Sequence, residues 1–249
     1  VWATFTAARE KLAATDPAVG LTRERWLLLL FRELGYGRLT ATPAGGLHVG
    51  DRAFPLSHLW GSVPIHLLGW GVELDRRTKG VPGAAERAPH AMVQELLNRS
   101  DEHLYAVVSN GRALRLLRDS TSLSGQSYVE FDLEAMFDGE VFSDFVLLFL
   151  LLHQSRVEVL EGGGPPSDCW LERWRTTSIE SGTRALTLLR DGVQQAIEVL
   201  GTGFLRHPAN ADLRGRLADA TLSIEDYHRS LLRLACRLLF LFVAEDRQA

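Results

Sequence analysis

Apolar side chains recur at helical spacing near the start of the chain, and short punctuated segments follow them. The helical positions are Trp26, Leu27, Leu30, Phe31 and Leu34. Thr22 precedes this stretch as an expected N-cap and Gly35 follows it, so the pattern predicts a helix over 23–34. Residues 38–42, 47–59 and 63–74 are bounded by Gly, Pro and Asp. This punctuation is typical of strands, and it predicts three of them.

A second helix and a hairpin are predicted next. Over 89–98 the apolar positions Met92, Val93, Leu96 and Leu97 form one stripe, and Pro89 stands at the first helical position, where proline is tolerated. Two apolar runs, 104–109 and 112–117, flank Asn110-Gly111. This dipeptide favours the type I′ turn of a β-hairpin.

The rest of the chain reads as helix. The apolar run 145–152 predicts a buried helix that closes a first domain, and the Gly- and Pro-rich stretch 161–167 predicts a linker. After it, a helix carrying Leu186 and Leu200 on one face is expected to end at Gly201 and Gly203. A last helix begins at Ser223, close to a capping box. We therefore expect an α/β domain over 1–160 and a helical connector over 161–249.

Composition is that of an ordinary globular protein. The 249 residues are 46% hydrophobic and 23% charged, with a formal net charge of −4. The two cysteines, Cys169 and Cys236, lie far apart, which excludes a disulfide framework or a cage of paired thiolates. No apolar run approaches the roughly 20 residues of a membrane span, and no secretion signal opens the chain. We expect no membrane partner and a cytoplasmic location.

Two further features concern the context of the chain. It opens on Val1 and stops directly after a long helical pattern, so we expect it to be a piece of a longer protein. Of its 27 basic residues only Lys11 and Lys79 are lysines. The arginine excess suits phosphate contacts, although codon bias is the simpler explanation.

The predicted order of helix, three strands, helix and hairpin is that of the restriction-nuclease fold. That fold holds a divalent cation with an Asp on the second strand and an acidic-x-Lys triplet on the third. Arginine stands two places before each lysine, so the chain contains no such triplet. The expected metal positions fall at Gly69 and Gly71, which cannot bind a cation. A shifted register offers Asp51, Glu73 and Asp75 as remnant candidates for magnesium.

Other catalytic or metal-binding patterns are missing. His48, His58 and His66 match no compact ligand spacing, so structural histidines are the better interpretation. The sequence has no nucleophile elbow, no dinucleotide loop and no phosphate loop. The loop that binds S-adenosylmethionine and the Asn/Asp-Pro-Pro-Tyr/Phe motif are also missing. We expect no catalytic residue, no metal and no cofactor within these residues.

Several segments, taken in their order along the chain, carry a resemblance to a family. They are 89–100, 109–112, 116–120, 128–134, 169–174, 203–205 and 238–247. Together they resemble the N-terminal region of type IIG-like restriction-modification proteins, over most of the chain from about Trp26 onward. In that family an Ala-Glu-Asp-Arg helix, here 244–247, precedes a domain that methylates adenine with S-adenosylmethionine. Such proteins serve restriction and phage-defence systems, including those called DISARM and BREX.

The element order leads us to expect a degenerate restriction-nuclease-like mixed sheet with flanking helices, followed by an α-helical connector, and the resemblance implies that this chain is the front end of a defence methyltransferase. Its role would be to hold duplex DNA or a defence-complex subunit while the following domain methylates adenine. Near the hairpin, Arg112, Arg115 and Arg118 are the expected phosphate contacts. Strand alternation places Arg112 and Arg115 on opposite faces. A pure protein-interaction module and a magnesium-dependent endonuclease are the alternatives.

Overall fold

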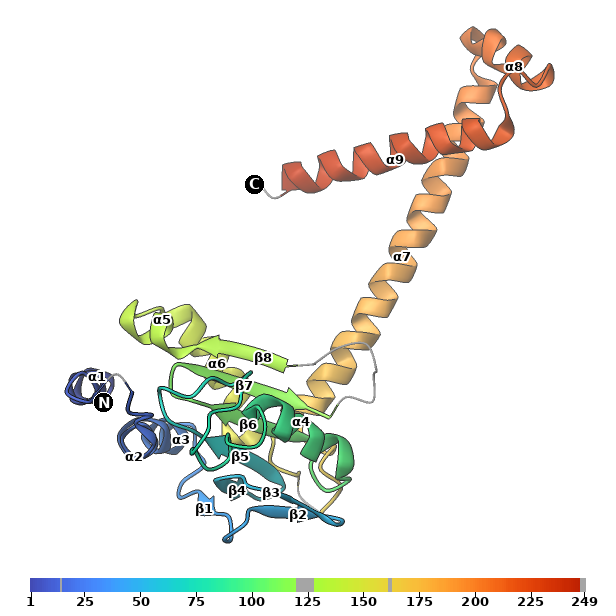
Figure 1. Ribbon diagram of the computed structural model, residues 1–249. Helices are drawn as coiled ribbons and strands as arrows, with labels where there is room; N and C mark the ends of the chain where they lie inside the picture. The colour runs from blue at the N-terminus through green and yellow to red at the C-terminus, as the bar shows by residue number, and fades with distance from the viewer. Residues whose placement is uncertain (14, 120–127, 161–162, 247–249) are drawn as a thin grey trace. The chain divides into compact units, whose positions relative to one another are not determined.

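The protein forms two compact units, each with its own architecture. The computed structural model describes residues 1–13, 15–119, 128–160 and 163–246 (Figure 1). The first unit is Val1–Arg175 and the second is Thr176–Ala249. The division falls within one long helix, 15 residues after the boundary that composition suggested at 160.

A mixed six-stranded sheet is the centre of the first unit. Its strands lie in the order β1-β4-β5-β6-β7-β8. They are β1 (Thr40–Ala41), β4 (His58–Trp60), β5 (Val63–Leu67), β6 (Tyr105–Ser109), β7 (Ala113–Arg118) and β8 (Tyr128–Asp132). Only β5 and β6 pair in parallel; the other neighbours are antiparallel. The α/β class predicted from the sequence is therefore confirmed.

The strand segments are divided more finely than the sequence suggested. The predicted strand 47–59 contains a separate small hairpin of β2 (Leu47–Val49) and β3 (Arg52–Phe54), followed by β4. The predicted strand 63–74 ends at Leu67 in β5. β8 was not predicted; it pairs with β7 along its full length, for example Arg115 with Glu130.

Helices cover both faces of the sheet (Figure 1). One face packs Ile65, Val107 and Leu116 against α1 (Trp2–Arg9) and against the continuous helical segment of α2 (Val19–Thr22), η1 (Arg23–Leu27) and α3 (Leu28–Glu33). The prediction of Thr22 as an N-cap is wrong, because the helix begins three residues earlier, at Val19. The Thr22 hydroxyl instead accepts a hydrogen bond from the backbone N–H of Trp70, at 3.1 Å.

The opposite face packs on the helix that connects the two parallel strands. This helix, α4 (Pro89–Arg99), has Pro89 in its first turn, as predicted. Its Met92, Val93, Leu96 and Leu97 are buried in a core with Ala106 and Val108 of β6. The sheet is thus the middle of three layers.

The predicted hairpin is present, but its turn is of another kind. β6 and β7 pair from Tyr105 with Arg118 to Ser109 with Leu114. Only Gly111 has a positive φ in this turn, of +85°, whereas a type I′ turn requires positive φ at both central residues. The Asn110 side chain closes the turn instead, since its Oδ1 accepts the N–H groups of Arg112 and Ala113.

The helices after β8 complete the first unit. They are α5 (Leu133–Asp138), α6 (Phe142–Leu152) and the short η2 (Gln154–Arg156). α6 was predicted to be buried, and this is only half correct: Leu148 and Leu152 are buried, while Phe142 is 75% and Leu147 is 55% exposed. The run is apolar on all sides, but one side alone packs on the core.

The second unit is helical. Its long helix α7 (Trp170–Arg206) starts in the first unit, and η3 (Pro208–Asn210), α8 (Ala211–Ala218) and α9 (Ile224–Asp246) follow. The prediction that Gly201 and Gly203 end this helix is wrong, because α7 continues to Arg206. The Tyr227 hydroxyl of α9 donates a hydrogen bond to the Gly201 carbonyl at 2.8 Å. The predicted cap of α9 is confirmed, because Ser223 Oγ accepts the Asp226 N–H at 3.0 Å.

Candidate functional site

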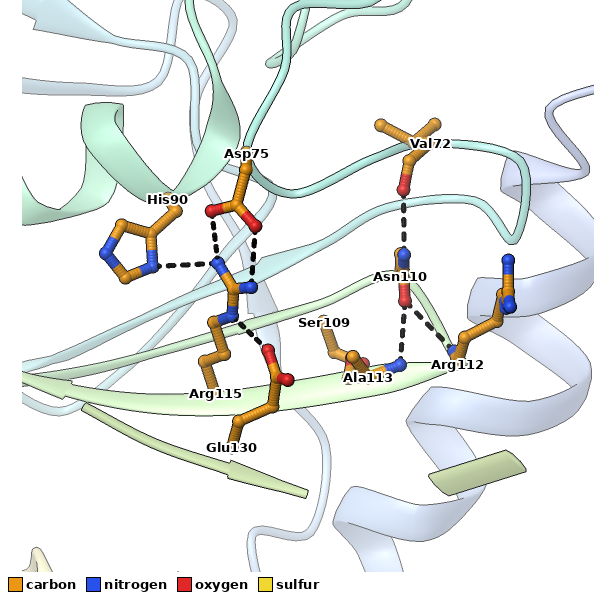
Figure 2. A network of polar contacts seen from close by, with 9 residues as sticks. All are labelled: Val72, Asp75, His90, Ser109, Asn110, Arg112, Ala113, Arg115 and Glu130. Atoms are coloured by element: carbon orange, nitrogen blue, oxygen red, sulfur yellow. Dashed lines mark hydrogen bonds and ion pairs between the residues drawn. The ribbon is translucent and has the colours of Figure 1, made fainter. Parts of the chain in front are cut away.

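Arg115, one of the predicted DNA contacts, lies at the centre of a polar network on the α4 face of the sheet (Figure 2). Its Nη1 and Nη2 donate to the two carboxylate oxygens of Asp75 at 2.6 and 2.7 Å. Its Nε donates to Glu130 on the neighbouring strand β8, and Nη1 also contacts His90 Nδ1 at 3.2 Å. The side chain is only 8% exposed, so this arginine binds the protein's own carboxylates.

Charge pairing shifts the protonation of this network. The hydrogen bonds from Arg115 lower the pKa of Asp75, and those to Asp75 and Glu130 raise the pKa of Arg115. Burial and the nearby guanidinium lower the pKa of His90. The Tyr128 ring stacks over the same guanidinium, with 4.8 Å between its centroid and Cζ. The network therefore stabilises the positively charged form of Arg115.

The turn beside this network is attached to two other parts of the first unit. The Asn110 amide donates to the Val72 carbonyl at 2.8 Å (Figure 2). The Trp26 indole N–H donates to the Gly111 carbonyl at 2.9 Å. A Cβ at Gly111 would lie 2.5 Å from Thr22 Cγ2, so helix and turn approach closely only because residue 111 is glycine.

Arg112 is the most accessible of the three predicted contacts. Its side chain is 56% exposed, and its Nε donates to Glu134 at 3.1 Å. The guanidinium carbon lies 5.7 Å from the Trp70 ring centroid, and Arg9 lies over the same ring at 4.2 Å. Nη1 and Nη2 of Arg112 have no hydrogen-bond partner within the described parts of the chain. They can reach a ligand from solvent.

Arg118 lies at the far end of β7 and joins the sheet to the start of α7. Its Nε and Nη2 donate to the Glu172 carboxylate at 2.9 and 2.8 Å, and the Tyr105 hydroxyl donates to the same carboxylate at 2.6 Å. Burial alone would raise the pKa of Glu172, but these hydrogen bonds lower it. Arg112 and Arg115 lie on opposite sides of the sheet, as predicted: Arg115 contacts His90 of α4, whereas Arg112 lies near Trp70, which packs against the other core.

The three remnant carboxylates are not brought together. Asp51 lies in the turn between β2 and β3, Glu73 pairs with Arg76 at 3.6 Å, and Asp75 is bound by Arg115. No three His, Cys, Asp or Glu side chains of the described residues are grouped so that they could hold a metal ion.

Of the two positions where the nuclease fold would hold its cation, Gly69 is also closed, whereas a Cβ at Gly71 would lie 3.3 Å from its nearest neighbour, Pro17 Cα. A Cβ at Gly69 would lie 1.9 Å from the Pro17 carbonyl oxygen, so the N-terminal segment fills this place. β4 and β5, the strands in the positions that would carry the metal ligands, contain no Asp or Glu. Any side chain with a Cβ atom at residue 69 would require the backbone to move.

Two of the three clustered histidines are buried near Arg23. His58 Nδ1 lies 2.9 Å from Ser57 Oγ, and His66 Nε2 lies 3.0 Å from the Gly83 carbonyl oxygen. Desolvation and, to a smaller extent, the nearby Arg23 guanidinium lower the pKa of each to about 4. Both are therefore neutral at pH 7 and have structural contacts, as the spacing suggested.

Sequence reasoning missed the acidic partners of the arginines. Glu130 and Glu172 each receive hydrogen bonds from a predicted DNA contact. Recognition of β8 as a strand would have placed Glu130 opposite Arg115, because alternating residues of paired strands share a face. No comparable pattern in the sequence indicated that Glu172 would contact Arg118.

Comparison with known proteins gave no match: no family model, curated protein or solved structure is similar to this chain. In the part that the structure describes, no helix is both long and apolar enough to span a membrane.

Proposed function

We propose that the first unit is a restriction-nuclease-like domain without a cleavage site, and that it binds duplex DNA. The element order supports this proposal, because a helix, three strands of one mixed sheet, a helix and a hairpin occur in the order of that fold, with the separate β2–β3 hairpin inserted between β1 and β4. The lack of any acidic residue on β4 and β5, together with Gly69 packed against Pro17, supports the loss of the cleavage site. The single observation that carries DNA binding is the exposed Arg112 at the hairpin turn.

Arg112 is the strongest candidate for a phosphate contact. It is exposed at the hairpin turn, and its two terminal nitrogens point to no carboxylate of the described residues. Arg115 and Arg118 were predicted to act beside it, but their guanidinium groups bind Asp75, Glu130 and Glu172. A phosphate contact by either would require one of these ion pairs to open.

Fluorescence anisotropy with a labelled DNA duplex, repeated at several salt concentrations, tests this role. Wild-type affinity should fall steeply with salt, and Arg112→Ala should reduce the slope of log affinity against log salt by about one. Arg32→Ala removes an exposed arginine from α3 and is the matched control. An unchanged slope for Arg112→Ala would remove this residue from the interface.

The proposed parent protein is an S-adenosylmethionine-dependent, adenine-specific DNA methyltransferase of a bacterial restriction-modification or phage-defence system. The resemblance of the segments named above supports this assignment. Sequencing the reading frame beyond residue 249 tests it. A loop for S-adenosylmethionine followed by Asn-Pro-Pro-Tyr or a close variant is expected, and a stop codon or an unrelated domain would refute the assignment.

A protein-interaction module for a defence-complex subunit is the second candidate. It is favoured by apolar side chains near the end of α9: Phe240 is 74%, Leu241 is 59% and Phe242 is 61% exposed. Exposed apolar surface of this kind is typical of contact with other proteins. Duplex DNA that fails to bind at any salt concentration would favour this candidate over the first.

The endonuclease alternative has its own test. Magnesium-dependent nicking of duplex DNA that disappears in Asp75→Ala would support it. We expect no nicking, because Asp75 binds Arg115 and does not meet Asp51 and Glu73 in a group able to hold a cation.

A further inference from the structure

We propose a second binding site, for a phosphate group, where β3 meets α4. Three arginines there converge on one carboxylate. Arg52 and Arg87 donate through Nη1 to the two oxygens of Glu95, and Arg99 donates through Nε to Glu95 at 3.1 Å. The sequence alone did not indicate this cluster, because the arginines come from β3, from the loop before α4 and from α4 itself.

The cluster has more cationic charge than its carboxylates neutralise. Three guanidinium groups face Glu95, and Glu86 is the other acidic side chain that lines the adjoining cavity. The exposed Asp51 precedes Arg52 in the chain. Arg99 does not line the cavity; of the residues that do, Arg52 and Arg87 carry two positive charges and Glu86 carries one negative charge. An anionic ligand would balance this excess within the lining.

Free donors accompany this charge. Within the part of the chain that the structure describes, Arg52 and Arg87 each use only Nη1 for hydrogen bonding. Their Nη2 and Nε groups have no protein acceptor in that part of the chain. A guanidinium group can bind two phosphate oxygens at once through two of its nitrogens. A carboxylate that occupies only Nη1 leaves Nη2 and Nε available for this.

A cavity of about 250 Å³ provides space beside these donors. Arg52 and Arg87 line it, and Phe54, Pro55, Pro82 and Met92 form apolar walls. It is smaller than the roughly 300 Å³ at which pockets for drug-sized ligands begin. Its size and its arginines therefore fit a phosphate group with a small attached moiety.

The partial burial of Glu95 explains why the arginines stay in position without a ligand. Its side chain is 24% exposed, against 44% for Arg87 and 48% for Arg99. The carboxylate thus holds the guanidinium groups together, while their outer surfaces remain in solvent. Such preorganisation reduces the entropy lost when an anion binds.

Isothermal titration calorimetry of the chain with inorganic phosphate tests the site, with sodium chloride keeping the ionic strength constant. Saturable binding at one site is expected. Arg52→Ala and Arg87→Ala should weaken it at least about tenfold, Arg87→Lys should weaken it less, and Arg32→Ala should leave it unchanged. Unchanged thermal melting of Arg87→Ala will show that the variant is folded. Lack of saturable binding by the wild type, or equal binding by all variants, would overturn the proposal.

The source of the phosphate group is decided by anisotropy with duplex DNA. If the group belongs to a nucleic-acid backbone, Arg87→Ala weakens DNA binding and free phosphate competes with the duplex. If it belongs to a small phosphorylated compound, Arg87→Ala binds DNA as the wild type does while its affinity for phosphate falls. The salt slope of Arg112→Ala is measured separately, so failure at the hairpin and failure at this cavity are distinguishable.

Discussion

Arg115 and Asp75 form a two-point ion pair in which both terminal nitrogens of the guanidinium donate to the two oxygens of the carboxylate, at 2.6 and 2.7 Å. The arginine is 8% exposed and the aspartate is 64% exposed. The pair connects the loop after β5 to the middle of β7. Two residues that the sequence assigned to different candidate sites, one for metal and one for DNA, thus bind each other.

Replacement of the arginine should destabilise the first unit. Arg115→Ala removes hydrogen bonds to Asp75 and Glu130 from a buried position, and we expect a loss of about 2 kcal/mol in the free energy of unfolding. Urea denaturation measures this. Arg76→Ala, which removes an 81% exposed arginine paired with Glu73, should change stability by less than about 0.5 kcal/mol. Equal effects of the two variants would contradict a structural role for Arg115.

The buried histidines predict a loss of stability in weak acid. Their pKa values of about 4 lie below the value of about 6.5 in an unfolded chain, so the unfolded state binds more protons between these limits. The free energy of unfolding should therefore decrease as pH falls from about 6.5 towards 4. Urea denaturation across this range should show a smaller decrease for His66→Gln than for the wild type. His48→Gln is the control, because it replaces an exposed histidine.

The Asp75 carboxylate adds a separate dependence at lower pH. Hydrogen bonds from Arg115 lower its pKa in the folded state, so the stability that it contributes is present above the unfolded value of about 3.9 and is lost as pH falls further. Asp75→Asn should lose this part of the acid dependence while keeping the part due to the histidines. An identical acid limb in wild type and Asp75→Asn would show that the pair contributes nothing.

Gly111 should tolerate no side chain. Gly111→Ala combines a positive φ of +85° with a Cβ at 2.5 Å from Thr22 Cγ2, and we expect a loss of at least about 2 kcal/mol. Gly37→Ala separates the two causes, because φ is +63° there but no atom lies within 4 Å of the added Cβ. This control should cost about 1 kcal/mol. Thermal melting of both variants measures the difference, and a Gly37→Ala loss as large as that of Gly111→Ala would exclude the steric contribution.

Glu172 should hold the first turn of α7 to the sheet. Glu172→Gln replaces the charged acceptor of Arg118 and Tyr105 with a neutral amide. We expect faster amide hydrogen exchange over 170–175, because opening of this turn then costs less free energy. Exchange in α4 is the internal reference and should stay the same. Unchanged protection over 170–175 would show that packing of Cys169 and Leu171 is sufficient.

Local patterns in the sequence determined many of the elements. The apolar stripe and Pro89 located α4, the flanking apolar runs located the β6–β7 hairpin, and Ser223 located the start of α9. These features depend on residues close in the chain, whose spacing fixes helix faces and caps. The placement of Arg115 and Arg118 on opposite faces of β7 follows from the same local geometry.

Only the tertiary structure decided what the candidate site residues bind. The sequence could not show that Asp75 meets Arg115, that Glu172 meets Arg118, or that Pro17 fills the place next to Gly69. Nor could it show the convergence of Arg52, Arg87 and Arg99 on Glu95. Arg87 and Arg99 are the exceptions, eight and four residues from Glu95, but most of these relationships join segments far apart in the chain. Their geometry depends on how the sheet and helices pack, because a side chain's charge does not by itself specify its partner.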